Sequence, residues 1–363
     1  MIEIESLEEL DRAAARAEAS GSMRDWQVQG LDLTGREQQL LGLDPRGALF
    51  LGCTIAESAA DRLREGGALL FPAVPDVPFD PWRSHLYTPG ELYAGVEAGY
   101  EDTPDAQIYA WTRQVHRTGS LKELLAQALH DSSVDDALEE FTRGRRVVGV
   151  MGGHALDRDD PAYAEAAHLG HELAGTGLTV ATGGGPGAME AANLGSRLAD
   201  QPVNTLDRVL EQIATVPSFA PDVSAWARVA IESVRHAGDS GRSLGIPTWH
   251  YGHEPPNPFS SAVAKYFRNA IREDVLLEVC RAGLVFLPGV AGTVQEVFQA
   301  ACTNYYATAE RVAPMVFVGR TYWTETLPAW PLVRALAAGR PLESRAHLVD
   351  DTSVVRGLLV RDT

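Results

Sequence analysis

The chain has 363 residues, 45% of them hydrophobic, which is enough to bury one large core or two smaller ones. Its formal net charge of −18 argues against a nucleic-acid partner, because such a partner requires a basic face. No apolar run reaches the roughly 20 residues of a membrane span, and the acidic start of the sequence is unlike a signal peptide. We therefore expect a soluble cytoplasmic protein with neither a membrane nor a nucleic-acid partner.

Residues 1–142 are predicted to form an acidic N-terminal α+β domain. An amphipathic helix is expected at about 6–19, followed by short apolar runs at 47–54 and 67–71. A proline-rich stretch and two further helical patterns, at 88–99 and 121–142, complete this part. We find no internal repeat in it. The pattern changes near 143–146, where we place the domain boundary.

In residues 143–363 apolar runs alternate with helical patterns, which predicts an α/β fold with a parallel sheet covered on both faces. A helical segment at about 200–240 is expected to be an insertion. Ligands of such sheets bind at the carboxyl ends of the strands, and all three glycine turns of this part follow predicted strands. Strands are expected at 147–151, 178–181, 244–249, 284–287 and 314–318, and helices at 161–175, 187–198, 261–280 and 293–308.

One of these turns, at 288–293, is followed by a carboxylate. Gly289 and Gly292 let the backbone approach a ligand closely, and Thr293 can cap the next helix or donate its hydroxyl. Free N–H groups at a helix N-terminus suit a phosphate. Glu296 lies about one helical turn further on, so its side chain can reach the mouth of the turn. The candidate binding residues are Pro288, Gly289, Ala291, Gly292 and Thr293.

A second glycine turn, at 183–187, opens another predicted helix and offers N–H donors in the same way. Alone it would be weak evidence, because glycine clusters after strands are often only turns, but two such turns favour an anion site. Neither G-x-G-x-x-G nor a lysine-bearing phosphate loop is present, which favours a monophosphate over a dinucleotide or triphosphate. The candidate contacts here are Thr182, Gly183, Gly184, Gly185, Gly187, Met189 and Glu190.

Three cations, Lys265, Arg268 and Arg272, are spaced i, i+3 and i+7 in the helix expected at 261–280. This spacing places them on one helix face, which is either solvated or directed at the ligand. We expect at least one of them to contact the ligand, with Arg272 as the first choice and Arg268 as the second.

The remaining candidates are pocket residues. Gly152, Gly153 and His154 follow the strand expected at 147–151, and His154 could equally make a structural hydrogen bond. In the segment 250–256, His253 and Glu254 suggest a metal site at first sight. Gly252 and two prolines prevent the helix that the zinc motif needs, so we expect a pocket-shaping loop and no metal.

Together the turn 183–190, the arginine-bearing helix and the segment 288–296 resemble the LONELY GUY group of phosphoribohydrolases. They are also similar to the bacterial nucleotide 5′-monophosphate nucleosidases of that superfamily. The resemblance covers roughly residues 147–318. It implies a Rossmann-like doubly wound sheet, a homodimer or higher homo-oligomer, and hydrolysis of the N-glycosidic bond of a nucleoside 5′-monophosphate to free base and ribose 5-phosphate.

Carried over by position, Glu296 matches the family's catalytic glutamate and Arg272 most nearly matches its catalytic arginine. The glycine turns match the phosphate and ribose contacts. The sequence departs from the family at Val290, where a second glycine is usual, and at Glu273, where a lysine usually follows the arginine. These departures leave the choice between Arg272 and Arg268 open.

The expected chemistry is general acid–base and electrostatic catalysis without a cofactor. Cleavage builds positive charge on the ribose, which the Glu296 carboxylate stabilises while it orients or deprotonates water. The expected substrates are AMP, GMP or CMP. The alternative is a non-catalytic nucleotide sensor or cofactor carrier that uses the same cradle. Amino-acid decarboxylation with pyridoxal phosphate is disfavoured, because Lys265 is the only lysine of this half.

Overall fold

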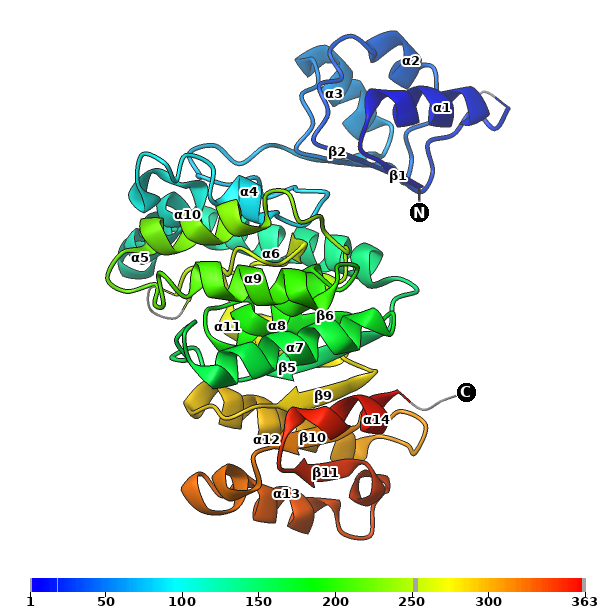
Figure 1. Cartoon of the computed structure of the whole chain (residues 1–363). Helices are drawn as coiled ribbons and strands as arrows, with labels where there is room; N and C mark the ends of the chain where they lie inside the picture. Colours follow the sequence, from blue (N-terminus) through cyan, green and yellow to red (C-terminus); the bar gives the residue numbers. More distant parts are fainter. Residues whose placement is uncertain (1, 18, 251–253, 361–363) are drawn as a thin grey trace. The chain divides into compact units, whose positions relative to one another are not determined.

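The computed structural model describes residues 2–17, 19–250 and 254–360, and the chain forms two compact units (Figure 1). The first unit consists of Met1–Leu86 and Arg113–Leu138, and the second of Tyr87–Thr112 and Glu139–Thr363. The boundary expected near residue 142 is therefore not a single cut. Residues 87–112 belong with the large sheet because Tyr93 and Tyr100 pack with Trp226 in a buried cluster of the second unit.

Strands and helices alternate in the first unit, and its four strands are parallel in the order β1-β2-β3-β4. This is an α/β arrangement, which differs from the α+β domain expected from the sequence. Its elements are β1 (Ile2–Ile4), α1 (Leu7–Ala17), β2 (Trp26–Gln29), α2 (Glu37–Leu41), β3 (Leu49–Leu51), α3 (Glu57–Glu65) and β4 (Leu69–Phe71).

In the first unit each helix leads to a new strand that pairs in parallel with the strand before it, so the same β–α unit is repeated along the chain. Ile4, Val28, Phe50 and Leu70 lie side by side in the register of the four strands. The first three are fully buried and pack with the helices in one core. No repeat is evident in the sequence, because these positions share an apolar character and not a residue type.

Residues 87–142 form short and long helices rather than strands. The helix expected at 88–99 is limited to four residues and ends at Leu92; the positive φ angles of Gly95 and Gly99 prevent a helix over the rest of that range. The helices of this stretch are α4 (Pro89–Leu92), α5 (Pro104–Thr118) and α6 (Leu121–Thr142), with a 3-10 turn at Tyr100–Asp102.

The second unit holds a seven-stranded parallel sheet in the order β11-β10-β9-β5-β6-β7-β8. From β5 the chain first adds strands on one side, then returns at β9 and adds strands on the other. This confirms the doubly wound Rossmann-like sheet and puts its switch point between β5 and β9. The strands are β5 (Val147–Met151), β6 (Thr179–Thr182), β7 (Ser243–Gly245), β8 (Ala262–Val263), β9 (Gly283–Phe286), β10 (Met315–Val318) and β11 (Ala346–Val349).

Helices cover both faces of this sheet. Because crossovers between parallel strands are right-handed, the reversal at the switch point sends α7 and α8 to one face and α12 and α13 to the other. The helices are α7 (Pro161–Gly175), α8 (Ala188–Arg197), α9 (Val203–Ile213), α10 (Val223–Val234), α11 (Asn269–Val279), α12 (Ala291–Tyr306), α13 (Ala329–Ala337) and α14 (Val355–Leu359), with helical turns at Tyr322–Thr326, Pro341–Ser344 and Thr352–Val354. Helices α9 and α10 lie in the segment 200–240.

The helix expected over residues 261–280 is wrong in its first half. Residues 262–263 form β8 beside β7, and α11 begins only at Asn269. The stretch from Ala262 to Phe267 is entirely buried, so it lacks the polar face of a surface helix. Lys265, Arg268 and Arg272 consequently do not share one helix face.

Helices α7 and α8 approach each other closely because glycines lie at their contact. A Cβ on Gly195 would clash with the carbonyl oxygen of Ala167 and lie 2.7 Å from the backbone nitrogen of His171. Backbone atoms cannot rotate away as a side chain can, so the helices themselves would have to separate.

We expect Gly195→Ala to lower the free energy of unfolding by about 3 kcal/mol, since overpacking a close contact strains the backbone. Gly175→Ala at the end of α7 is the control, because a Cβ there meets no atom within 4 Å. Urea unfolding of the two variants checks this. Equal stabilities of the two variants would contradict a close contact between α7 and α8 at Gly195.

Among the described residues, no helix combines the length and the apolar character needed to cross a membrane.

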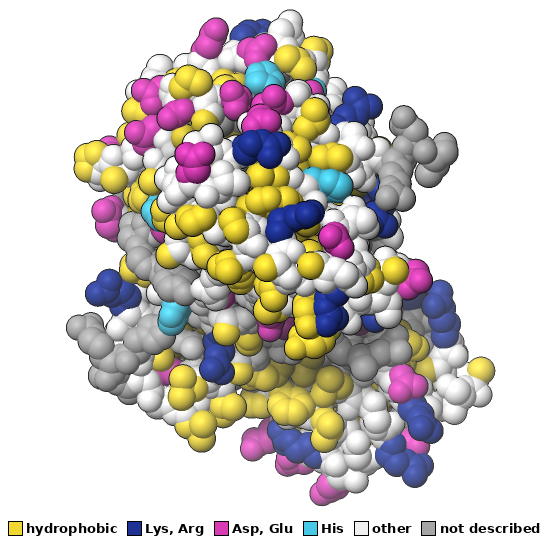
Figure 2. All heavy atoms as spheres, turned by 90° about the horizontal axis from the view of Figure 1, so that it is seen from below, with side chains coloured by type: hydrophobic (Ala, Val, Ile, Leu, Met, Phe, Trp, Pro, Cys, Tyr) yellow, Lys and Arg dark blue, Asp and Glu magenta, His cyan; other side chains and the backbone are white. Residues whose placement is uncertain are grey.

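Large hydrophobic side chains that remain exposed in the second unit include Tyr306, Leu332 and Leu336. Figure 2 shows hydrophobic side chains gathered along the middle of the face seen from below. The homo-oligomer implied by the resemblance stays a prediction.

Candidate functional site

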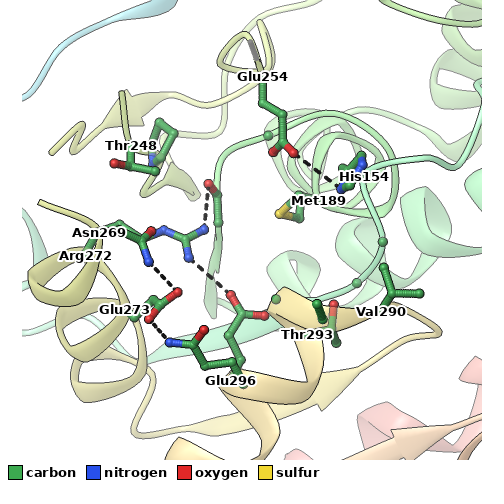
Figure 3. Close-up of a pocket in the computed structure, with 18 residues that line it drawn as sticks. His154, Met189, Thr248, Glu254, Asn269, Arg272, Glu273, Val290, Thr293 and Glu296 are labelled. Carbon is green, nitrogen blue, oxygen red and sulfur yellow. Dashed lines mark hydrogen bonds and ion pairs between the residues drawn. The ribbon is translucent and has the colours of Figure 1, made fainter. Parts of the chain in front are cut away.

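A pocket lies at the carboxyl ends of β5, β6 and β9, at the switch point of the sheet. This is where doubly wound sheets bind ligands. Its cavity has a volume of about 360 Å³ and both glycine turns contribute to it (Figure 3). The lining residues are Gly152, Gly153, His154, Gly183, Gly185, Met189, Pro247, Thr248, Glu254, Asn269, Arg272, Glu273, Val290, Ala291, Gly292, Thr293, Gln295 and Glu296.

The N-terminus of α12 forms one wall of the pocket. Helix geometry leaves the first N–H groups without a partner inside the helix, and the described hydrogen bonds include none donated by the backbone of Ala291, Gly292 or Thr293. Pro288 and Gly289 lie just behind this wall. Gly289 packs so closely against Thr293 that a Cβ would clash with the Thr293 hydroxyl, and its carbonyl accepts a hydrogen bond of 2.9 Å from Tyr322.

Val290 lies at the mouth of the same wall with 60% of its surface exposed. Its φ of −101° is not in the left-handed region, so the turn does not require glycine at this position. Valine is thus compatible with the conformation of this turn.

Arg272 and Glu296 form a buried pair across the pocket floor. The guanidinium of Arg272 donates to Glu296 Oε1 at 3.4 Å, to the carbonyl of Ile246 at 2.7 Å and to the carbonyl of Gly183 at 3.2 Å. A Cβ on Gly183 would clash with this guanidinium, which explains glycine at that position. Three acceptors from different elements therefore hold Arg272 in one orientation beside Glu296.

Burial raises the pKa of Glu296 to about 7, although the nearby Arg272 lowers it and Glu273 raises it further. Only 6% of Glu296 is exposed. At neutral pH the side chain is accordingly divided between its acid and its carboxylate. A carboxyl poised in this way can donate a proton, accept one, or bind a neutral ligand group.

Glu273 is a second carboxylate of the pocket, and the sequence did not single it out as a candidate contact. Asn269 Nδ2 donates to its Oε1 at 2.6 Å, and Gln295 Nε2 donates to its Oε2. These residues come from α11 and α12, which pack against each other. The signal that could have found Glu273 was its place directly after Arg272, where the family has a lysine.

The second glycine turn contributes fewer pocket residues than expected. Gly183, Gly185 and Met189 line the cavity, whereas Thr182, Gly184 and Gly187 lie behind it. The Thr182 hydroxyl donates to Asn193 Oδ1 at 2.6 Å and accepts from the backbone of Gly184 at 2.9 Å. Its polar atoms therefore serve the turn itself.

Glu190 is directed away from the cavity and into the protein. Its Oε1 accepts hydrogen bonds from Arg158 Nε at 3.0 Å and Nη2 at 2.5 Å, and neither side chain is accessible to solvent by more than 1%. Burial raises the pKa of Glu190, and Arg158 opposes that rise. Glu190 therefore lies in the core beneath the turn and does not line the pocket.

His154 and Glu254 face each other at the rim of the pocket, with 3.5 Å between His154 Nδ1 and Glu254 Oε1. Both line the cavity. His253, the other candidate of this loop, lies outside the described residues. Within the part of the chain that the structure describes, no group of three or more His, Cys, Asp or Glu side chains is placed to hold a metal.

The other two cations of the expected helix lie away from the cavity. Lys265 is fully buried and its ammonium donates to Asp105 Oδ1 at 2.6 Å, an atom that also accepts from Trp249 at 2.9 Å. Burial lowers the pKa of Lys265, and Asp105 opposes that fall. Arg268 precedes α11 and does not line the pocket. Of the three cations only Arg272 reaches the cavity.

Comparison with known proteins supports a resemblance to the superfamily that contains the LONELY GUY group. Residues 145–201, which run from β5 through α8, match the model described as LDcluster4, the SLOG cluster4 family. SLOG stands for the SMF/DprA-LOG superfamily, in which LOG abbreviates LONELY GUY. This match stops short of the α12 turn and of Glu296. It therefore supports the superfamily and does not specify an enzyme.

No curated protein matches the chain. Among solved structures, it is similar to the molybdenum cofactor binding protein from the phototrophic bacterium Rippkaea orientalis, with 16% identity over 59% of this chain and 94% of that chain, at a TM-score of 0.33. It is also similar to the Moco carrier protein from Chlamydomonas reinhardtii, with 19% identity over 59% of this chain and 98% of that chain, at a TM-score of 0.32. Neither likeness carries an argument about the ligand.

Proposed function

We propose that the pocket binds a small phosphorylated molecule of the nucleoside 5′-monophosphate kind, so that the chain serves as a nucleotide sensor or carrier. The observation that carries the proposal is the N-terminus of α12, which presents the backbone of Ala291, Gly292 and Thr293 to the cavity. Such a terminus is a ready anion site. Arg272 adds the positive charge that the helix dipole alone lacks.

Because its pKa is raised, Glu296 can be neutral near pH 7, which favours binding of a phosphate close by. A dianion in the pocket disfavours further negative charge nearby, and a carboxyl with a pKa of about 7 can take up a proton and remain neutral. Binding of the phosphate requires nothing more than the N-terminus of α12 and Arg272. For that reason we propose ligand binding as the first function of the chain and catalysis as the second.

The Arg272–Glu296 pair favours a second candidate function, hydrolysis of the N-glycosidic bond. As the bond breaks, positive charge develops on the ribose, and the ionised fraction of Glu296 would stabilise it and orient the attacking water. Arg272 would keep that carboxylate in position through its contact of 3.4 Å. The products would be a free base and ribose 5-phosphate, and the chemistry calls for no cofactor.

A panel of AMP, GMP and CMP tests both functions on the full chain. We expect calorimetry to show binding of at least one nucleotide, with the matching nucleoside binding much more weakly because it lacks the phosphate. Chromatography for free base then separates a carrier from a hydrolase. Failure of all three nucleotides to bind would refute the proposal.

Gly292→Asp locates the phosphate within the pocket. A side chain fits there, because a Cβ on Gly292 meets no atom within 4 Å, and an aspartate in the first turn of a helix does not harm folding. We expect roughly 100-fold weaker nucleotide binding, since two anions are then forced together. Gly357→Asp in α14, also in open space, is the control. Undiminished binding by Gly292→Asp would place the phosphate elsewhere.

A further inference from the structure

The charge of the pocket lining restricts the ligand beyond its phosphate. Three carboxyl groups, those of Glu254, Glu273 and Glu296, face the cavity, whereas Arg272 and His154 are its cationic or ionisable basic groups. A ligand that is anionic at every point would meet repulsion over much of this surface. The ligand must therefore be anionic at one end and complementary to carboxylate elsewhere.

Glu273 is the carboxylate with the best defined position. Only 5% of the residue is exposed, and two amide groups, Asn269 Nδ2 and Gln295 Nε2, hold its two oxygens. A carboxylate oxygen has room for about two hydrogen bonds, so each retains capacity for a donor from the cavity side. Two partners on two helices prevent Glu273 from turning away from the pocket.

Glu273 and the N-terminus of α12, where we propose that the phosphate binds, lie on opposite sides of the Arg272–Glu296 pair. Figure 3 shows Val290 and Thr293 to one side of Glu296, and Asn269 with Glu273 to the other. A nucleotide with its phosphate on α12 and its ribose beside Glu296 thus extends its base toward Glu273.

We propose that Glu273 is a specificity-determining residue that accepts a hydrogen bond from the exocyclic amino group of the base and so selects an amino-bearing base over its keto counterpart; this rests on the proposed function. A carboxylate only accepts hydrogen bonds. The amino group of cytosine or adenine would donate to it, whereas the keto oxygen of uracil or hypoxanthine would bring two acceptors together. A polar site of this kind discriminates because the wrong ligand leaves buried groups unpaired.

The test is equilibrium binding of two matched pairs, CMP against UMP and AMP against IMP, to the full chain. We expect the amino-bearing member of at least one pair to bind roughly 10- to 100-fold more tightly, the range for a hydrogen bond to a charged group. Chromatography of the recovered nucleotide shows whether it stayed intact during the measurement.

Glu273→Gln should bring this ratio close to one, because glutamine can accept or donate, and Asn269 and Gln295 can flip their amides to suit it. The ratio is informative because a merely structural defect would weaken both members alike. Glu278→Gln is the control, since Glu278 lies on the same helix with 73% of its side chain exposed.

Equal binding of the paired nucleotides to the wild type, or a ratio unchanged in Glu273→Gln, would overturn this role of Glu273 and leave the proposed function standing. Absence of binding by all four nucleotides, with GMP also failing to bind, would overturn both. The wild-type ratio decides the matter alone if Glu273→Gln does not fold.

Discussion

Replacing Arg158 with methionine is expected to lower the free energy of unfolding by about 3–5 kcal/mol, because breaking a buried ion pair leaves an uncompensated charge. Arg158 donates two hydrogen bonds to Glu190 and one of 3.1 Å to the carbonyl of Trp226. Its guanidinium also lies 4.6 Å from the ring centroid of Trp226. The residue thus joins α8, which carries the second glycine turn, to the helical segment 200–240.

The double variant Arg158→Met/Glu190→Gln is the matched control for this prediction. It removes both charges, so we expect it to be more stable than Arg158→Met alone. The deficit of the single variant should shrink from pH 7 to pH 5, because the stranded Glu190 has a raised pKa and takes up a proton. Urea unfolding at both pH values gives the result. A double variant no more stable than the single one would contradict it.

Glu296→Gln is expected to stabilise the protein at pH 8 and to change its stability little at pH 5. The pKa of Glu296 rises from 4.5 to about 7 on folding. Between these values the folded state holds a proton that the unfolded state has released, so the free energy of unfolding falls as the pH rises. Glutamine resembles the protonated acid and escapes this loss, which is about 3 kcal/mol above pH 7.

The same variant separates the two candidate functions. If the chain is a hydrolase, we expect Glu296→Gln to release base about 1,000-fold more slowly while it still binds the nucleotide, since general acid–base groups typically contribute 10²–10⁴-fold. If the chain is a carrier, binding persists and no base is released before or after the change. Glu278→Gln serves as control for both measurements.

Two results would count against this role of Glu296. A stability difference between wild type and variant that does not change with pH would mean that the side chain is ionised normally. Full base release by the variant would mean that another group does the chemistry. Thermal unfolding at pH 5 and pH 8, followed by chromatography of the reaction mixture, covers both.

Much of the second unit could be predicted because its patterns are local. Apolar runs such as 147–151 stop at glycine turns, and amphipathic stretches such as 161–175 follow them, so β5, α7 and the fold class come from neighbours in the chain. The segment 288–296 was informative for the same reason. A turn, a helix N-terminus and the position of Glu296 on that helix all depend on a few consecutive residues.

The assignment of the three cations shows where local patterns end. Lys265, Arg268 and Arg272 have helical spacing, yet Lys265 is buried against Asp105, a residue far away in the sequence. Pairing of β8 with β7, rather than helix propensity, determines that segment. Which cation reaches the pocket could be learned only from the folded chain.

The glutamates illustrate the same division. The local sequence placed Glu190 and Glu296 alike, each near the start of a helix behind a glycine turn, and did not single out Glu273. Tertiary packing directs Glu190 to Arg158 in the core, and it directs Glu273 and Glu296 into the cavity. Backbone propensity and hydrophobic periodicity depend on neighbouring residues, and they determine the helices and strands that carry these glutamates. Strand order, burial and ion pairing depend on residues that are distant in the sequence. They decide which of the carboxyl groups face a ligand, and only the tertiary structure shows them.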